Sequence, residues 1–153
     1  MGRILSEVNL AYIAGLFDGD GAIMAHIEKH SEKRFGFRVR VIIKITQKDP
    51  KILYWIKSVT KLGNVDKDRT TYEWILRNQS EVLDFLIKLK TFFRVKNKQA
   101  QLAIEILQIE INSQKDLLYK AKLADTLSGF NVRSKGRRKN FATRIQESIP
   151  RND

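Results

Sequence analysis

The segment that most constrains the fold is an expected helix over residues 8–18 that carries apolar side chains on every side. Ser6 is the expected N-cap residue, and Glu7 adds a favourable negative charge to the first turn. Because a helix that is apolar all round must be buried all round, one side should pack on a sheet of the same chain. We expect Gly19 and Gly21 to end the helix. The other side is small enough for a second backbone to approach closely: Ala11, Ala14, Gly15 and Asp18.

Two carboxylates, those of Asp18 and Asp20, stand at the C-terminal end of this helix, where the macrodipole disfavours negative charge. Together with the unpaired helix carbonyls they would make a negative pocket suited to a hard cation. The neighbouring glycines would let metal, water and phosphate approach closely. A solvated Asp-Gly turn is the ordinary alternative. The apolar helix before the motif and the absence of other metal ligands favour the cation site.

The sequence holds a single copy of this acidic motif. One metal-binding carboxylate is too little for efficient phosphodiester hydrolysis, whereas two could hold metal that stabilises both the attacking and the leaving oxygen. Ala14 and Gly15 would let two copies of the helix pack closely and bring both Asp20 side chains near a twofold axis. The motif count therefore favours a homodimer over a monomer with two half-domains.

The formal charge is +12 over 153 residues, which implies a polyanionic partner such as nucleic acid or an anionic membrane surface. Solubility alone would need less charge. The absence of cysteine excludes disulfides, zinc fingers and thiol catalysis. With two histidines, any metal should have oxygen ligands, which favours Mg²⁺. No apolar run suits a membrane span, and no targeting signal is evident. We expect a soluble intracellular protein, in an organelle or a prokaryotic cytoplasm.

Hydrophobic periodicity predicts the order helix, two strands, helix, two strands and then helices, an α+β fold. We expect residues 1–112 to form the core, with the motif helix over residues 7–20. Residues 113–153 should be a helical, basic extension of the same domain, fraying or wrapping onto a partner after residue 130. The expected strands are 22–28, 35–46, 64–69 and 72–77, with the last two joined around Thr70-Thr71. The expected later helices are 51–62, 80–90, 98–112 and 117–127, with Gly63 and Gly129 as stops.

The polar faces of the first two strands are a candidate DNA reader, because a two-stranded ribbon fits the major groove. Arginine can pair there with guanine, and glutamate can accept from cytosine N4. An ordinary solvated sheet face is the alternative. The candidate DNA-binding residues are Met24, His26, Glu28, His30, Lys33, Arg38, Arg40, Lys44, Glu73, Arg77, Arg137, Arg138 and Lys139.

Two further places carry candidate chemistry. The amide of Gln47, at the end of the long strand, could position water or a metal-bound hydroxide; a polar residue that merely ends the strand is the alternative. The basic cluster over residues 94–98 comes directly before a helix. A lysine there could stabilise charge in a phosphoryl-transfer transition state or bind the DNA backbone.

The segment 13–21 resembles the signature of the LAGLIDADG homing endonucleases, in their single-motif, intron-encoded branch. The resemblance spans nearly all of residues 8–110 and weakens beyond Asn112. It continues through Thr46-Gln47-Lys48, Leu62-Gly63, residues 72–76 and Lys96-Asn97-Lys98-Gln99-Ala100. It implies an αββαββα core with a saddle-shaped antiparallel sheet in the DNA major groove, followed by C-terminal helices, and dimerisation through the motif helices.

The resemblance also implies site roles. Mg²⁺ would be bound by Asp20 and the Gly19 carbonyl, with Mn²⁺ as a substitute and Ca²⁺ allowing binding without cleavage. Gln47 and Lys96 would lie near the scissile phosphates, with Lys98 as the rival lysine. Lys51 would be the basic residue of the loop after the glutamine.

The expected activity is therefore that of a metal-dependent endonuclease. It would make a staggered double-strand break in a long, partly palindromic DNA site. The expected partners are double-stranded DNA and a second copy of the chain, with no membrane and no small-molecule substrate. Some family members have lost cleavage and act as RNA maturases or regulators, and this is the alternative function. The presence of Asp20, Gln47 and Lys96 favours cleavage.

Overall fold

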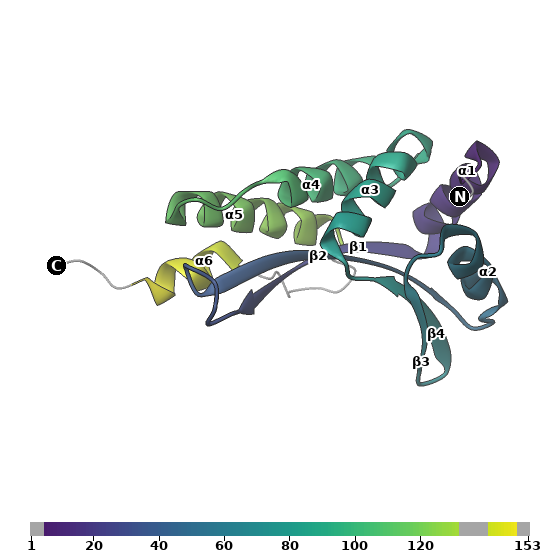
Figure 1. Cartoon of the computed structure of the whole chain (residues 1–153), viewed down its shortest axis with the longest axis horizontal. Helices are drawn as coiled ribbons and strands as arrows, with labels where there is room; N and C mark the ends of the chain where they lie inside the picture. The colour runs from purple at the N-terminus through teal and green to yellow at the C-terminus, as the bar shows by residue number, and fades with distance from the viewer. Residues whose placement is uncertain (1–4, 132–140, 150–153) are drawn as a thin grey trace.

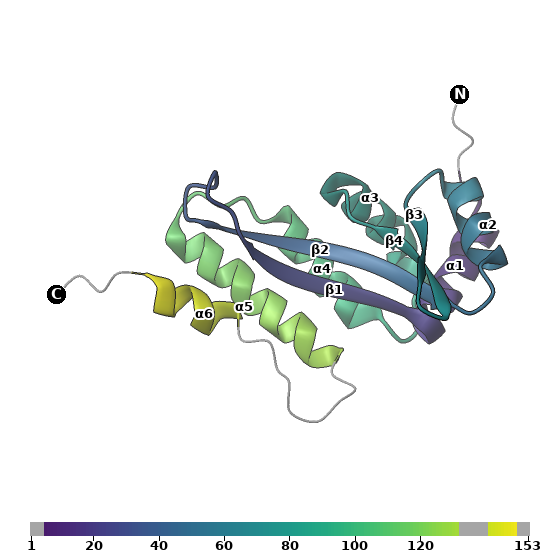
Figure 2. The same ribbon diagram turned by 90° about the horizontal axis from the view of Figure 1, so that it is seen from below.

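A computed structural model of the chain describes residues 5–131 and 141–149. Its centre is a four-stranded antiparallel sheet in the order β1-β2-β4-β3. The strands are β1 (Gly21–Lys29), β2 (Phe37–Gln47), β3 (Asn64–Asp68) and β4 (Thr71–Leu76). In Figure 1, the helices α3, α4 and α5 lie on one side of the long β1–β2 ribbon. Seen from below, β1 and β2 lie in front of α4 and α5 (Figure 2), so none of the described helices covers the middle of the opposite face. The predicted α+β class and the predicted order of helices and strands along the chain are confirmed.

The helix α1 (Glu7–Asp20) begins as predicted, because the Ser6 hydroxyl accepts a hydrogen bond from the Asn9 backbone N–H at 3.1 Å. Its bounds match the motif helix predicted over residues 7–20, but Gly19 does not end it. Gly19 lies inside the helix, and Gly21 is the first residue of β1. Gly21 has a φ of −89°, so it is not a left-handed cap. An added Cβ would instead come within 2.3 Å of the Phe17 ring, so glycine is required here for close packing.

The period-two alternation of β1 and β2 is confirmed by burial, since the side chains of Ile23, Val41 and Ile43 are fully buried. The second hairpin differs from the prediction by one residue. Asp68 pairs with Thr71, so its turn is Arg69-Thr70 rather than Thr70-Thr71. Arg69 adopts a φ of 55° there. The prediction missed this because arginine rarely takes the left-handed conformation that such tight hairpin turns require.

The helix α2 (Lys51–Thr60) ends before Leu62, because Lys61 takes the left-handed cap conformation with a φ of 59°. Gly63 therefore does not stop this helix. It has its own positive φ of 77°, and an added Cβ would lie 2.6 Å from the indole Nε1 of Trp74. That Nε1 donates to the Leu62 carbonyl at 2.9 Å, so Gly63 gives the buried tryptophan its place beside the loop.

The later helices are α3 (Gln79–Leu89), the 3₁₀ turn η1 (Lys90–Phe92), α4 (Asn97–Gln108), α5 (Gln114–Phe130) and α6 (Phe141–Ser148). Two predictions fail in this part. Gly129 lies inside α5, where one glycine costs only about 1 kcal/mol and need not end a helix. The stretch expected to fray contains α6, whose Phe141, Ala142 and Ile145 are buried. Asp125 of α5 accepts hydrogen bonds from the first backbone N–H groups of α6.

One hydrophobic core joins α1, the inner face of the sheet, and the helices up to α6. Phe17 of α1 packs edge-on against Trp74 of β4 and Phe93 of the loop after η1. These contacts fix the end of α1 against the sheet and against the start of α4. Among residues 5–131 and 141–149, no helix combines the length and apolar character needed to cross a membrane.

Candidate active site and nucleic-acid interface

The C-terminal end of α1 lies beside the end of β2, and this brings Asp20 and Gln47 together. The Gln47 Nε2 donates to the Asp20 Oδ2 at 2.7 Å. Asp20 is exposed, whereas Gln47 is half-buried. The contact joins residues 27 positions apart in the sequence. Among the described residues, the other carboxylate oxygen of Asp20 has no hydrogen-bond partner.

Asp18 is held by the loop before α4. Its carboxylate accepts hydrogen bonds from the backbone N–H groups of Arg94 at 2.8 Å, Val95 at 3.2 Å and Lys96 at 3.0 Å. Its charge is therefore used inside the chain. These partners could not be predicted for Asp18, which was expected at a dimer interface, because they lie 76 to 78 positions away and no local pattern marks them.

The same loop places Lys96 at the end of α1. Lys96 is 8% exposed, and among the residues that the structure describes it is the only buried charged residue. Its Nζ donates to the Asp18 carbonyl at 3.3 Å. This carbonyl belongs to the last turn of α1, where helix carbonyls lack helical partners and attract cations. Lys98 is exposed on α4. Of the two rival lysines, Lys96 is the one that contacts the last turn of α1, the turn that carries Asp20.

One chain offers few ligands for a metal ion at this place. Nowhere in residues 5–131 and 141–149 do three or more His, Cys, Asp or Glu side chains come close enough to hold one. The Asp18 carboxylate is already taken by three backbone N–H groups. The donors that remain are the exposed Asp20 carboxylate and the backbone carbonyls at the helix end, including that of Gly19. These oxygen donors fit a hard cation, but they are too few to enclose one.

The exposed side of α1 differs from the predicted interface in two residues, Ala14 and the Asp18 already bound inside the chain. Ala14 is fully buried in the core of its own chain, so it is not available to a partner. Ala11, Tyr12 and Gly15 are exposed, and Val8 is 79% exposed. A Cβ added at Gly15 would meet nothing within 4 Å. The side that the chain leaves open therefore carries Val8, Ala11, Tyr12 and Gly15.

The sheet face away from α3, α4 and α5 carries the polar side chains of β1 and β2. Antiparallel pairing puts His26 opposite Arg40 and Glu28 opposite Arg38. Further along the sheet, the Lys44 Nζ contacts the Glu73 Oε1 of β4 at 2.9 Å. Lys33 and Arg77 are exposed, and His30 is half-buried with a buried Nδ1 that has no hydrogen-bond partner. Lys51 is exposed at the start of α2. Arg137, Arg138 and Lys139 lie outside the described residues.

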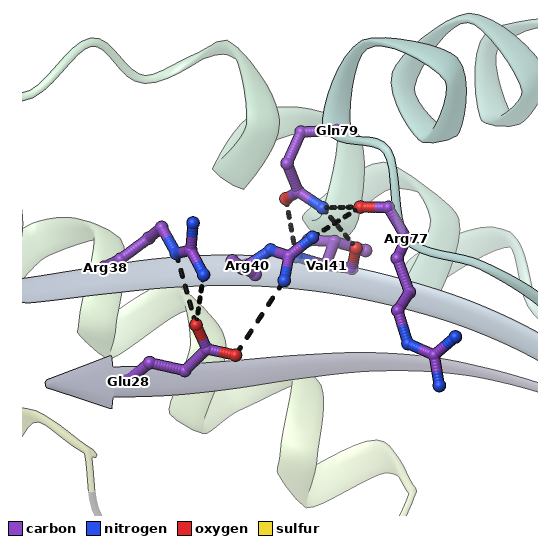
Figure 3. Close-up of polar contacts among 6 residues, drawn as sticks. All are labelled: Glu28, Arg38, Arg40, Val41, Arg77 and Gln79. Atoms are coloured by element: carbon purple, nitrogen blue, oxygen red, sulfur yellow. Dashed lines mark hydrogen bonds and ion pairs between the residues drawn. The ribbon is translucent and has the colours of Figure 1, made fainter. Parts of the chain in front are cut away.

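Figure 3 shows a continuous polar network on this face. Arg38 donates to Glu28 through both Nε and Nη2. This bond is the largest of several contacts that hold the pKa of the Glu28 carboxyl below its ordinary value. The Arg40 Nη1 lies 3.9 Å from the other Glu28 oxygen, and its Nη2 donates to the Arg77 carbonyl at 2.9 Å. The two arginines are thus held in place before any ligand binds.

The sequence profile of the LAGLIDADG endonucleases matches residues 13–103, which is more than half of the chain. The chain belongs to this family. The DNA endonuclease I-CreI of Chlamydomonas reinhardtii is 32% identical over 101 residues, which are 65% of this chain and 62% of the relative. The matched part thus covers less than two thirds of that relative's length.

Solved structures of homing endonucleases share the fold over most of this chain. I-CvuI, solved with the I-CreI target DNA and Mg²⁺, has a TM-score of 0.81 at 25% identity, over 92% of each chain. The archaeal intron-encoded I-Vdi141I, solved with DNA, has a TM-score of 0.77 at 25% identity, over 92% of this chain and 94% of that one. I-SmaMI has the same fold at 19% identity and a TM-score of 0.74, over 94% of this chain and 50% of its own.

Proposed function

We propose that this LAGLIDADG chain is a site-specific homing endonuclease that cleaves both strands of a long DNA site as a homodimer. The observation that carries the proposal is the meeting of Asp20, Gln47 and Lys96 at the end of the motif helix. The relatives support it, since I-CreI is a DNA endonuclease and both I-CvuI and I-Vdi141I were solved with DNA.

A divalent metal fits the oxygen donors at this place. Asp20 would bind it with its carboxylate and Gly19 with its backbone carbonyl. The bound metal would activate water and neutralise charge on the phosphate. Mg²⁺ is the proposed ion, with Mn²⁺ as a substitute and Ca²⁺ supporting binding without cleavage. I-CvuI was solved in the presence of Mg²⁺ and of Ca²⁺, which agrees with the use of divalent cations.

The chain's own residues have distinct tasks. Gln47 orients the Asp20 carboxylate through its Nε2 and can hold water near the scissile phosphate. The Lys96 ammonium group can support the negative charge that develops on the phosphoryl oxygens. Asp18 holds the backbone that carries Lys96. Lys51 and Lys98 are exposed and would contact the DNA backbone from either side.

Dimerisation is proposed because one chain offers too few oxygen ligands to enclose a metal ion. Because one chain supplies a single free carboxylate at the site, a second copy is needed to complete it. The open side of α1, with Gly15 at its centre, is the proposed contact between copies. A glycine that its own chain does not require lets a partner helix approach closely.

The exposed face of the sheet is the proposed reader of each half-site. Its residues offer guanidinium, ammonium, carboxylate and imidazole groups to base edges in the major groove. The proposed contacts are Met24, His26, Glu28, His30, Lys33, Arg38, Arg40, Lys44, Glu73 and Arg77. Arg137, Arg138 and Lys139 are proposed to bind flanking phosphates.

The test begins with a target, obtained by selecting cleaved sequences from a randomised DNA library in Mg²⁺. The selected site is then offered to wild type and to Asp20→Asn. We expect Asp20→Asn to bind in Ca²⁺ within about threefold of wild type and to lose cleavage in Mg²⁺. Asp84→Asn, which removes an exposed carboxylate on α3, is the matched control and should cut normally.

Two outcomes would overturn the proposal. Cleavage by Asp20→Asn at the wild-type rate would show that the metal site lies elsewhere. Selection of DNA that wild type binds but never cleaves, with Mg²⁺ or Mn²⁺, would replace the endonuclease with a nucleic-acid-binding maturase or regulator.

A further inference from the structure

The side chain of Gln79, the first residue of α3, completes the hydrogen bonding of β2 where β4 ends. The β2–β4 pairing stops at Ile43 opposite Leu76. Two residues further along β2, the Gln79 Oε1 accepts from the Val41 N–H at 2.9 Å and the Gln79 Nε2 donates to the Val41 carbonyl at 2.8 Å. The amide therefore takes the place of a strand residue that the backbone no longer supplies.

The same amide also fixes the backbone that holds Arg40. The Gln79 Nε2 donates to the Arg77 carbonyl at 2.7 Å, and this carbonyl is the acceptor for the Arg40 Nη2 at 2.9 Å. Figure 3 shows the Gln79 amide and the Arg40 guanidinium group both bonded to this oxygen, and the Gln79 amide also bonded to Val41. Both amide hydrogens of Gln79 are thereby used. Gln79 has no donor left for a base, so any influence on DNA recognition must pass through Arg40.

Arg40 is held from both sides. Its guanidinium group reaches the Arg77 carbonyl at the β4–α3 junction on one side and approaches Glu28 of β1 on the other. Its side chain is 20% exposed, so most of it is fixed against the sheet. An arginine that pairs with guanine must present two donors to O6 and N7 in one plane. A side chain already held in one position loses less freedom on binding, which sharpens discrimination between bases.

We propose that Gln79 is a positioning residue for DNA specificity, acting through the Arg77 carbonyl and Arg40 on one base pair of each half-site. The base that Arg40 reads is a guanine, because guanine offers the paired acceptors that a guanidinium group fits. The inference rests on the proposed role of the sheet face in base readout. It adds a residue that lies outside the candidate set found from the sequence.

The experiment measures base preference at every position of the target. Wild type, Arg40→Ala and Gln79→Met cleave a library in which each base pair of the selected site is varied in turn. A bidentate arginine contact gives about 5- to 150-fold discrimination, so Arg40→Ala should lower the preference for guanine at one position by an amount in this range. Gln79→Met keeps the side-chain length but removes all three bonds, and should lower the preference at that same position by about fivefold.

The matched control is Asn78→Ala. The Asn78 Oδ1 caps α3 by accepting from the Glu81 N–H, but it has no bond to Arg77 or Val41. This variant should lose stability, as cap removal does, and keep the base preferences of wild type. If the effect came from a general loosening of α3, Asn78→Ala would also lose the preference for guanine at that position. This result would overturn the inference.

The remaining outcomes separate the inference from the function on which it rests. Gln79→Glu, a second variant in case Gln79→Met does not fold, keeps an acceptor for the Val41 N–H but cannot donate to the Arg77 carbonyl. It should also lower the preference for guanine at the base pair that Arg40 reads. If Arg40→Ala changes the base preference at one position and neither Gln79 variant changes it, the Gln79 inference alone is wrong. If Arg40→Ala changes the base preference at no position, Arg40 does not read a base and the Gln79 inference is wrong as well.

Discussion

The end of α1 and the open face of the sheet hold their polar groups in different ways. At the end of α1, the main anchors are backbone groups: Asp18 accepts from three N–H groups, and Lys96 donates to a helix carbonyl. On the sheet, the main anchors are other side chains, as in the pairs of Glu28 with Arg38 and of Lys44 with Glu73.

This difference suits the two proposed tasks. Groups fixed by backbone bonds keep one position throughout a reaction, which transition-state stabilisation requires. Ion pairs between partly exposed side chains contribute little to folding and can exchange partners at little cost. The sheet face can therefore give up the pairs of Glu28 with Arg38 and of Lys44 with Glu73 for DNA. Arg40, which is held by a backbone carbonyl, and the end of α1 should change little on binding.

The largest expected effect is at Lys96. Lys96→Met keeps a long buried side chain but removes the ammonium group, and should lower the single-turnover cleavage rate by about 10²- to 10³-fold with DNA affinity in Ca²⁺ nearly unchanged. Lys98→Met is the matched control and should weaken binding modestly while cleavage of bound DNA persists. The reverse pattern would make Lys98 the active-site lysine.

The motif helix and the order of helices and strands could be predicted from the sequence, which also marked Asp20, Gln47 and Lys96 as candidate site residues. The sequence did not show which side of α1 the chain leaves exposed. Because that helix is apolar all round, burial of Ala14 in its own chain could not be distinguished from exposure. The partners of Asp18 lie too far away in the sequence to leave a local pattern. α6 was missed because its few apolar residues are buried by tertiary packing against α5.

The next effect is at Asp18, where Asp18→Asn would replace a carboxylate that accepts from three N–H groups by an amide with one acceptor oxygen. We expect a loss of about 1–3 kcal/mol in the free energy of unfolding and slower cleavage, because the backbone around Lys96 loosens. Urea denaturation and single-turnover kinetics measure these two effects.

A double-mutant cycle gives the control. If Asp18 acts through Lys96, adding Asp18→Asn to Lys96→Met should slow cleavage little further. Fully additive losses would contradict this positioning role.

Gly15 tests the contact between copies. A Cβ meets nothing inside the chain, so Gly15→Ala should keep the fold and gain up to about 1 kcal/mol from helix propensity. It should raise the dimer dissociation constant, measured by sedimentation, because two helices can no longer approach as closely. Gly129→Ala, which also meets nothing within 4 Å, is the matched helical control and should leave dimerisation unchanged. An unchanged dimer in Gly15→Ala would move the contact away from this side of α1.

The smallest expected effect is a pH dependence on the sheet face. The hydrogen bond from Arg38 lowers the pKa of Glu28 in the folded state, so its stabilising contribution is present above the unfolded pKa and is lost as pH falls through the folded value. The stability difference between wild type and Glu28→Gln should therefore shrink as pH falls below the ordinary value of 4.5. Urea denaturation at pH 7 and at about pH 3 measures it, and a difference that grows on acidification would contradict the assignment.

The most direct test of the central claim uses a mixed dimer. Two differently tagged copies, one wild type and one Asp20→Asn, are co-expressed and isolated together, and cleavage of the selected DNA site is measured in Mg²⁺. If each chain supplies one Asp20 to a shared site, the mixed dimer should bind the DNA and make no double-strand break. A double-strand break at the wild-type rate would show that one chain carries a complete active site, and would contradict the account.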